Sequence, residues 1–142
     1  MYSSILLPVD LAEPDASKRA LSVAAQLARD YSATLHVVTV VPDLGMSIVG
    51  GFFPRDYERR ALDEIKSRLK QFLEAEVPEG VTARGHVAHG RIYQEILRVA
   101  KLLAADLIVM SAHRPELSDY LLGPNAARVV RHASQSVMVV RE

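Results

Sequence analysis

The sequence predicts a doubly wound, Rossmann-like α/β domain, in which helices cover both faces of a five-stranded parallel sheet. One observation and one general rule predict this fold class. Short apolar runs of strand length alternate along the whole chain with longer segments whose apolar residues recur at helical spacing. Strands that alternate with helices form parallel sheets with right-handed crossovers. The 142 residues, 49% of them hydrophobic, suffice for a substantial core, and we expect one domain over residues 1–142.

The first half of the chain is expected to contain two strands and two helices. Residues 4–9 are rich in Ile, Leu and Val, as in a strand buried on both faces, and residues 34–41 are rich in β-branched residues. Apolar spacing between these strands predicts a helix over 15–31. The three glycines and two prolines of 42–54 predict a loop, and a helix with a charged outer side is expected over 56–76.

The second half is expected to complete the sheet with three strands. Residues 81–87 alternate as an edge strand does, 105–112 form a buried run, and 136–140 are β-branched. Helices are expected between them, from about residue 92 to 103 and over 124–132. In such sheets ligands bind outside the carboxyl ends of the strands, where the strand order reverses, so the turns after the first and fourth strands are the candidate site.

Composition and charge exclude several classes of protein. The chain has 17 basic and 17 acidic residues, a net charge of +0, which argues against a nucleic-acid partner. It has no cysteine, which excludes disulfides, thiolate catalysis and zinc–thiolate sites. The first residues lack the pattern of a signal peptide, and no apolar segment is long enough to cross a bilayer. We therefore expect a cytoplasmic protein without a membrane partner.

The turn before the last helix has the features of an anion site. Gly123 lets the backbone approach a ligand, and the first N–H groups of a helix favour a phosphate. Pro124 suits the first helical position but removes one donor, which leaves Asn125 and the backbone of Ala126. Arg114 could reach the phosphate from the loop. The alternative is an ordinary helix start with Arg114 in solvent.

Asp10 closes the first strand and is expected to face the same crevice. Its carboxylate could accept hydrogen bonds from a sugar hydroxyl or a base amine, or bind Mg²⁺ directly or through water. The alternative is a turn former for the residues that follow it.

No catalytic motif is present. The sequence contains no Walker-type loop, no Gly-x-Gly-x-x-Gly and no nucleophile elbow. His36, His86 and His89 lack the converging ligands of a metal site and are expected to be at the surface or hydrogen-bonded. His113 could contact a ligand but has no Ser/Asp partnership that would make it a base. We name no catalytic residue and expect at most slow ATP hydrolysis or self-phosphorylation.

Four segments resemble the universal stress protein family, and the resemblance runs from end to end. They are "ILLPVD", "HVVTVVP", "DLIVMSAHRP" and "LLGPNAARVVRHASQSVMVV". "AHRPELSDYLLGPNA" is most similar to the F/G-type subgroup of that family. The resemblance implies strand order 3-2-1-4-5, ATP or AMP as ligand, and a homodimer through the C-terminal strand. Ser111 stands at the first glycine of the family's nucleotide motif and Pro124 at its Ser/Thr, which bears more on triphosphate than on AMP affinity.

The resemblance also implies which residues border the nucleotide. The expected set is Pro8, Val9, Asp10, Val40, Val41, Met110, Ser111, His113, Arg114, Gly123, Pro124, Asn125, Ala126, Ser136 and Val137. Residues from the first two strands would border adenine and ribose, and those of the fourth strand and its loop the ribose and phosphate. The residues that open the last helix would meet the phosphates. A dimeric interaction module of the same fold that has lost the nucleotide remains the alternative, on the strength of Pro124 and the missing glycines.

Overall fold

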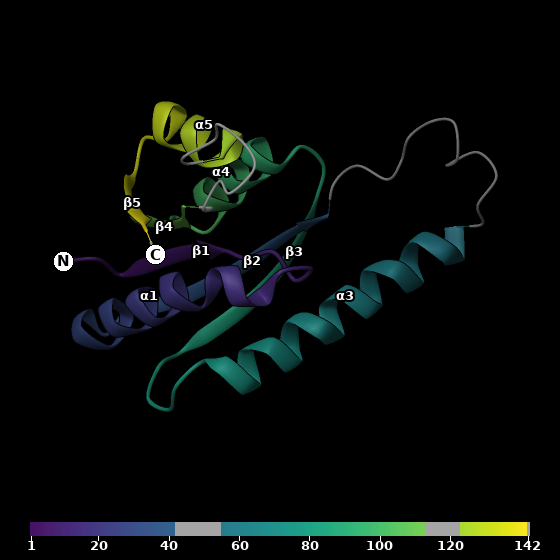
Figure 1. Cartoon of the computed structure of the whole chain (residues 1–142), viewed down its shortest axis with the longest axis horizontal. Coiled ribbons are helices and arrows are strands. Elements are labelled where there is room, and N and C mark those ends of the chain that lie inside the picture. The colour runs from purple at the N-terminus through teal and green to yellow at the C-terminus, as the bar shows by residue number, and fades with distance from the viewer. Residues whose placement is uncertain (42–54, 113–122, 142) are drawn as a thin grey trace.

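The computed structural model describes residues 1–41, 55–112 and 123–141. Five strands are β1 (Ser4–Pro8), β2 (Thr34–Val41), β3 (Ala83–His89), β4 (Leu107–Ser111) and β5 (Ser136–Val140). The helical elements are the 3-10 turn η1 (Pro14–Ser17), α1 (Lys18–Tyr31), α3 (Arg55–Glu76), α4 (Ile92–Leu102) and α5 (Pro124–His132). They follow one another in the alternation that the sequence predicts (Figure 1).

All five strands are parallel and lie in the order β3-β2-β1-β4-β5. This arrangement confirms the predicted fold class and the strand order that the resemblance implies. β1 is central, and the order reverses between β1 and β4 because successive strands are added first on one side of β1 and then on the other. The turns after these two strands therefore meet at one edge of the sheet.

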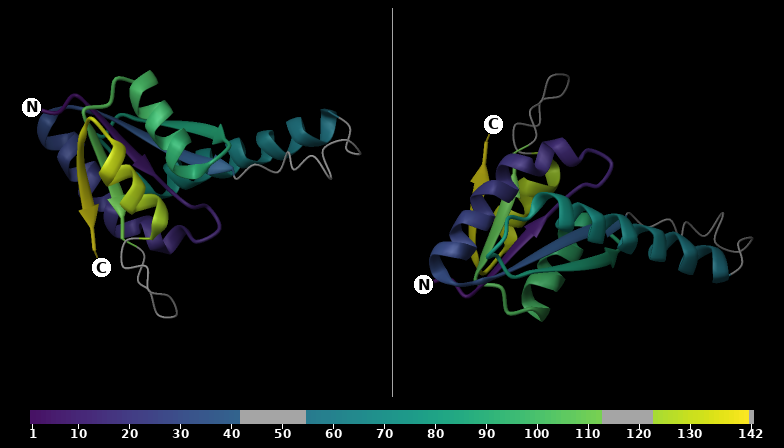
Figure 2. Two further views of the ribbon diagram at one scale, coloured as in Figure 1. Left: turned by 90° about the horizontal axis from the view of Figure 1, so that it is seen from above. Right: turned by 90° about the horizontal axis from the view of Figure 1, so that it is seen from below.

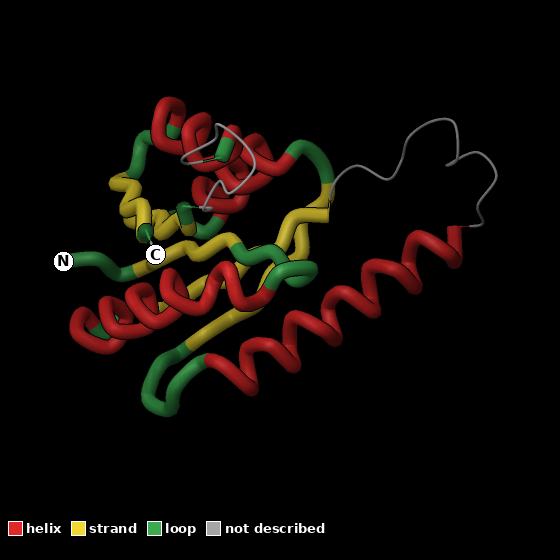
Figure 3. Tube along the Cα trace, viewed as in Figure 1, coloured by secondary structure: helices red, strands yellow, loops and turns green. Residues whose placement is uncertain are grey.

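Helices cover both faces of the sheet, as Figures 2 and 3 show. Ile5 and Leu7 of β1 face a core that α1 and α3 complete, whereas Leu6 faces a second core completed by α4 and α5. All three side chains are fully buried, which explains why β1 is an uninterrupted apolar run instead of an alternating one. The central strand is thus held from both sides.

Four elements differ from their predicted bounds by one or two residues at an end, namely β1, α3, α4 and β4, and two differ by more. The helix expected over 15–31 is divided into η1 and α1, and Pro14 occupies the first turn of η1. The strand expected over 81–87 is β3 at Ala83–His89, because β2 offers pairing partners as far as Val41, which pairs with His89. The predicted loop 42–54 lies outside the described residues. No helix of the described chain is long and apolar enough to cross a membrane.

Candidate functional site

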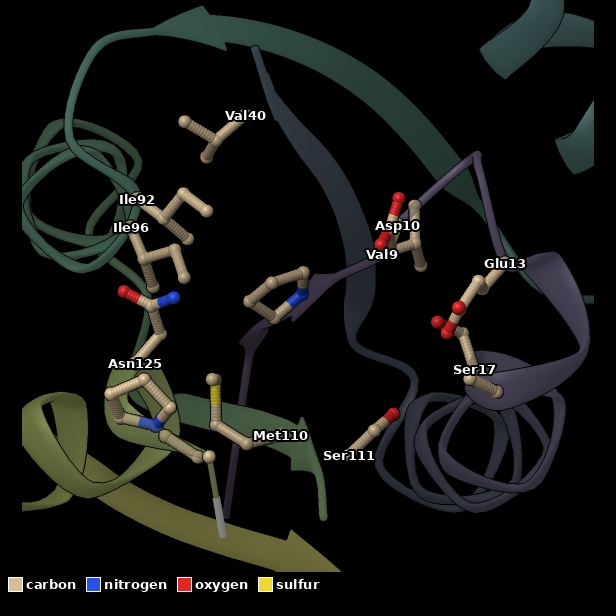
Figure 4. Close-up of a pocket in the computed structure, with 15 residues that line it drawn as sticks. Val9, Asp10, Glu13, Ser17, Val40, Ile92, Ile96, Met110, Ser111 and Asn125 are labelled. Atoms are coloured by element: carbon tan, nitrogen blue, oxygen red, sulfur yellow. The ribbon is translucent and has the colours of Figure 1, made fainter. Parts of the chain in front are cut away.

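A cavity of about 460 Å³ opens at the carboxyl edge of the sheet, between the ends of β1 and β4 (Figure 4). Its volume lies within the usual range of small-molecule pockets. Its lining comprises Pro8, Val9, Asp10, Glu13, Ala16, Ser17, Val40, Ile92, Ile96, Met110, Ser111, Gly123, Pro124, Asn125 and Ala126. These residues come from the ends of β1, β2 and β4, from η1 and the turn before it, and from the first two turns of α4 and the start of α5.

One wall of the cavity is apolar. Val40 at the end of β2 lies beside Ile92 and Ile96 of α4 (Figure 4). Ile96 is almost fully buried and anchors α4 in the second core. A flat, weakly polar ring can bury one face against these branched side chains, which is the most favourable use of such a wall.

The opposite wall carries two carboxylates. Asp10 and Glu13 lie there with Ser17 (Figure 4). The N–H of Ala12 donates to Oδ1 of Asp10 at 2.9 Å, and the N–H of Glu13 donates to the Asp10 carbonyl at 3.1 Å. Asp10 therefore shapes the turn and still presents its carboxylate to the cavity. Carboxylates only accept hydrogen bonds, so a ligand that contacts this wall has to supply donors or a cation.

The start of α5 forms a third part of the lining. Gly123 precedes the helix with φ 75° and ψ 151°, a conformation that favours glycine. The first helical hydrogen bond runs from the N–H of Ala127 to the Gly123 carbonyl at 3.2 Å. Pro124 has no N–H, so Asn125 and Ala126 supply the N–H groups that precede this bond. They are suited to bind an anion.

Ser111 ends β4 at the edge of the cavity. Its neighbour Met110 points into the core formed with α4 and α5, so Ser111 points to the other face of the sheet. Figure 4 shows its side chain on the side of Glu13 and Ser17. The Ser111 Oγ is buried and has no hydrogen-bond partner among the residues that the structure describes.

Ten of the predicted site residues line the cavity, and three other described ones do not. Val41 is buried next to it, where its carbonyl accepts the N–H of Gly90 at 2.9 Å. Ser136 and Val137 pair with Leu107 and Ile108, at the amino end of β4. They do not lie at the cavity, contrary to the prediction, because parallel strands begin at the opposite edge from the one at which they end. The remaining two, His113 and Arg114, lie outside the described residues.

Five lining residues were not predicted, namely Glu13, Ala16, Ser17, Ile92 and Ile96. The first three belong to the turn after the first strand, which the sequence did mark as part of the crevice. Ile92 and Ile96 were assigned only to the buried face of a helix. The signal for them was topological, since a helix that follows an edge strand begins at the carboxyl edge of the sheet.

No group of three acidic or histidine side chains within residues 1–41, 55–112 and 123–141 could hold a metal ion. The predicted Mg²⁺ contact of Asp10 therefore has no ready-made ligand set in that part of the chain. Glu13 is the other lining carboxylate, and Mg²⁺ commonly takes its remaining ligands from water and from substrate phosphates.

His36 and His86 form a pair away from the cavity. The His36 Nδ1 lies 2.9 Å from the His86 Nε2, on the sheet face that carries α4. Burial lowers the pKa of both rings, and the charge of Arg84 lowers both further, while His86 itself lowers the pKa of His36. Of the two predicted outcomes for these histidines, at the surface or hydrogen-bonded, the pair shows the hydrogen-bonded one.

Comparisons with known proteins bear on the family and the fold of the chain. The sequence model of the universal stress protein family matches residues 1–141. The chain is 32% identical to universal stress protein G of Shigella flexneri, over 99% of this chain and 100% of that protein. It superimposes with a TM-score of 0.71 on the universal stress protein from Archaeoglobus fulgidus in complex with dAMP, at 23% identity and 97% coverage of both chains. A universal stress protein in complex with cAMP gives a TM-score of 0.63 at 22% identity, over 99% of this chain and 97% of that one.

Proposed function

The chain belongs to the universal stress protein family, and from this premise we propose that it is a cytoplasmic, homodimeric stress-response protein that binds an adenine nucleotide, AMP or ATP, between β1 and β4. The observation that carries the proposal is the cavity at the carboxyl edge of the sheet, with an apolar wall, an acidic wall and a helix start around it. Each of these three parts suits one part of a nucleotide.

Adenine suits the apolar wall of Val40, Ile92 and Ile96, because an aromatic ring gains most from burial against branched side chains. Ribose hydroxyls and amines donate hydrogen bonds, as the carboxylates of Asp10 and Glu13 require. A phosphate suits the N–H groups that open α5. The two nucleotides in the related structures, dAMP and cAMP, are both adenine nucleotides with a single phosphate.

The cavity favours a monophosphate over a free triphosphate. Pro124 removes one N–H from the helix start, and the described lining contains two carboxylates and no cationic side chain. Further phosphates would add negative charge beside Asp10 and Glu13. We expect Mg²⁺, held in part by Asp10, to raise the affinity for ATP more than that for AMP.

The homodimer is proposed to form through β5. Within the described chain β5 pairs only with β4, so its outer edge lies at the end of the sheet. Met138 on this strand is 37% exposed, and Val137, Val139 and Val140 are partly exposed. An apolar edge strand of this kind needs a cover in a protein that stays unaggregated, and a second copy of the strand can supply it.

Calorimetric titration of AMP and ATP into unfolded and refolded protein, which carries no copurified ligand, tests the proposal. We expect micromolar binding that is weakened in Gly123→Val, because a side chain is strained at φ 75° and would displace the start of α5. Gly80→Val is the matched control. Gly80 has φ 87° and, like Gly123, has no atom within 4 Å of an added Cβ, but it precedes β3 at the opposite edge.

Equal weakening by the two glycine variants would contradict a site at Gly123. Absence of binding to either nucleotide at millimolar concentration would contradict nucleotide binding as such. That result would instead support the alternative that Pro124 and Ser111 favour, which is a dimeric interaction module of the same fold without a ligand.

A further inference from the structure

The outer edge of β3 presents backbone groups that no described strand pairs with. β3 ends the sheet, and β2 is its neighbour in the described chain. The N–H of Leu35 donates to the Thr82 carbonyl at 2.8 Å, and the N–H of Gly90 donates to the Val41 carbonyl at 2.9 Å. Because backbone groups alternate in direction along a strand, the even-numbered residues of β3 bond to β2. The groups that point outward include those of Ala83, Gly85 and Val87.

A groove of about 490 Å³ follows this edge between β3 and α3, which runs beside the strand (Figure 1). Its lining comprises Ala83, Gly85 and Val87 of β3 and Lys66, Leu69, Lys70, Leu73 and Glu74 of α3. A Cβ on Gly85 would lie 3.0 Å from Cδ2 of Leu69, so glycine lets α3 pack this close while the backbone at Gly85 stays exposed. An extended segment can therefore pair with β3 and place every second side chain in the groove.

The charge around the groove favours an acidic occupant. Lys66 and Lys70 are exposed on the side of α3, and neither forms an ion pair with another described residue. Arg84 is exposed on the other face of β3, and Glu74 is the carboxylate of the described lining. A second copy of the chain at this edge would bring the same three cations together, which is unfavourable. An acidic segment is attracted by all three.

We propose that the outer edge of β3 binds an extended acidic segment of another protein, which adds a strand to the sheet and places carboxylates at Lys66 and Lys70. Backbone hydrogen bonds would hold the segment, and the cations would select it. The edge lies at the opposite end of the sheet from β5, so this interaction is separate from the proposed homodimer. It also does not depend on nucleotide binding.

The first test uses a labelled peptide of about seven residues in which glutamate and valine alternate, with binding measured by fluorescence anisotropy. We expect a Kd of tens of micromolar, on the order of that of a small interface. A lysine–valine peptide should not bind, because its charge is wrong. A glutamate–proline peptide has the right charge but cannot form a strand, and it should bind about tenfold more weakly.

Amide hydrogen exchange in the wild type tests the backbone contacts. The N–H groups of Ala83, Gly85 and Val87 should exchange fast in the free protein and slow by at least about tenfold when the glutamate–valine peptide saturates it. The N–H groups of Arg84 and His86 bond to β2 and should be protected in both states.

Charge reversal tests the role of the two lysines. The double variant Lys66→Glu, Lys70→Glu should bind the glutamate–valine peptide about tenfold more weakly than the wild type. The matched control is Lys101→Glu, Arg131→Glu, which reverses two exposed charges on α4 and α5, away from the groove. It should keep the wild-type affinity.

Three results would overturn the proposal. Equal weakening by the two double variants, or equal binding of the glutamate and lysine peptides, would show that the groove does not select charge. Slow exchange at Ala83, Gly85 and Val87 in dilute free protein would show that the chain itself covers the edge. Protection that appears only as the protein concentration rises would show that a second copy does so. The exchange and peptide measurements on the wild type do not depend on whether a variant folds.

Discussion

The polar side chains at the two ends of β4 differ in their hydrogen bonding. Asp106 precedes the strand and accepts hydrogen bonds from the N–H of Ser3 at 2.9 Å, the N–H of Ser4 at 3.1 Å and the Ser3 hydroxyl at 3.1 Å. Ser111 ends the same strand, and its buried hydroxyl has no partner in the described chain. The amino edge of the sheet is therefore closed by the chain itself, whereas the carboxyl edge is left open.

This difference separates polar groups that stabilise the fold from polar groups that do not. Burial by itself raises the pKa of Asp106, but the N–H groups of Ser3 and Ser4 and the Ser3 hydroxyl outweigh it, and the pKa ends below its ordinary value. The charged form is thus favoured by folding. An unpaired hydroxyl such as that of Ser111 works against folding. The predictions that follow test the two halves of this contrast.

Asp106→Ala is expected to have the largest effect on stability. It removes the acceptor of three hydrogen bonds at the start of β1, and we expect the free energy of unfolding to fall by about 1–2 kcal/mol, less than for a fully buried carboxylate. Urea denaturation measures it. AMP affinity should be unchanged, since Asp106 lies at the edge opposite the cavity. Unchanged stability, or a loss of AMP affinity in a folded variant, would contradict the division between the two edges.

The His36–His86 pair, in a third region of the molecule, is expected to make the free energy of unfolding depend on pH. Because folding lowers the pKa of both rings, the unfolded chain takes up protons first as the pH falls below about 6.5. The stability that the neutral pair contributes is present above that pH and is lost below it, by at most about 1.4 kcal/mol per pH unit for each ring.

Urea denaturation from about pH 8 to about pH 5 measures this slope. His86→Gln should flatten the profile, because it removes one titrating ring and the repulsion between two protonated rings. The positive charge of Arg84 on β3 lowers the pKa of both rings and should steepen the wild-type slope. The slope of Arg84→Gln is therefore expected to lie between that of the wild type and that of His86→Gln. A wild-type profile as flat as that of His86→Gln would show that the pair does not resist protonation.

Pro124→Ser is expected to have the smallest effect. It restores a backbone N–H and adds a hydroxyl at the first position of α5, so ATP affinity should rise by a factor of about three to ten. AMP affinity should change less, because a single phosphate can use the N–H groups of Asn125 and Ala126. Calorimetry with both nucleotides measures how much each affinity changes. An equal change in the affinities for AMP and ATP would contradict the role assigned to Pro124.

Much of the fold was predictable from local pattern. β2, α5 and β5 have the predicted bounds, because β-branched runs define the strands and Gly123-Pro124 defines the start of the helix. The position of β3 was not predictable from local pattern. Pairing with β2 determines where β3 begins and ends, whereas the apolar alternation of β3 itself is weak. The split between η1 and α1 likewise does not follow from apolar spacing.

The candidate site was predictable only in part. The turns after β1 and β4 were found because the topological rule points to them. Ile92 and Ile96 were missed because sequence spacing shows that a helix face is buried but not which cavity it borders. Ser136 and Val137 were placed at the site by resemblance alone, and the parallel register puts them at the opposite edge.

Denaturation of the wild type and Ser111→Ala, each with and without AMP, tests the contrast between the two edges most directly. Without nucleotide the free energy of unfolding of the variant should equal that of the wild type or exceed it by up to about 1 kcal/mol, because the variant no longer buries an unpaired hydroxyl. With a fixed excess of AMP both proteins should gain stability, since the nucleotide binds the folded chain. A variant that is less stable than the wild type without nucleotide would show that Ser111 is a structural residue, and a wild type that gains no stability from AMP would show that the carboxyl edge holds no nucleotide. Either result would contradict the account.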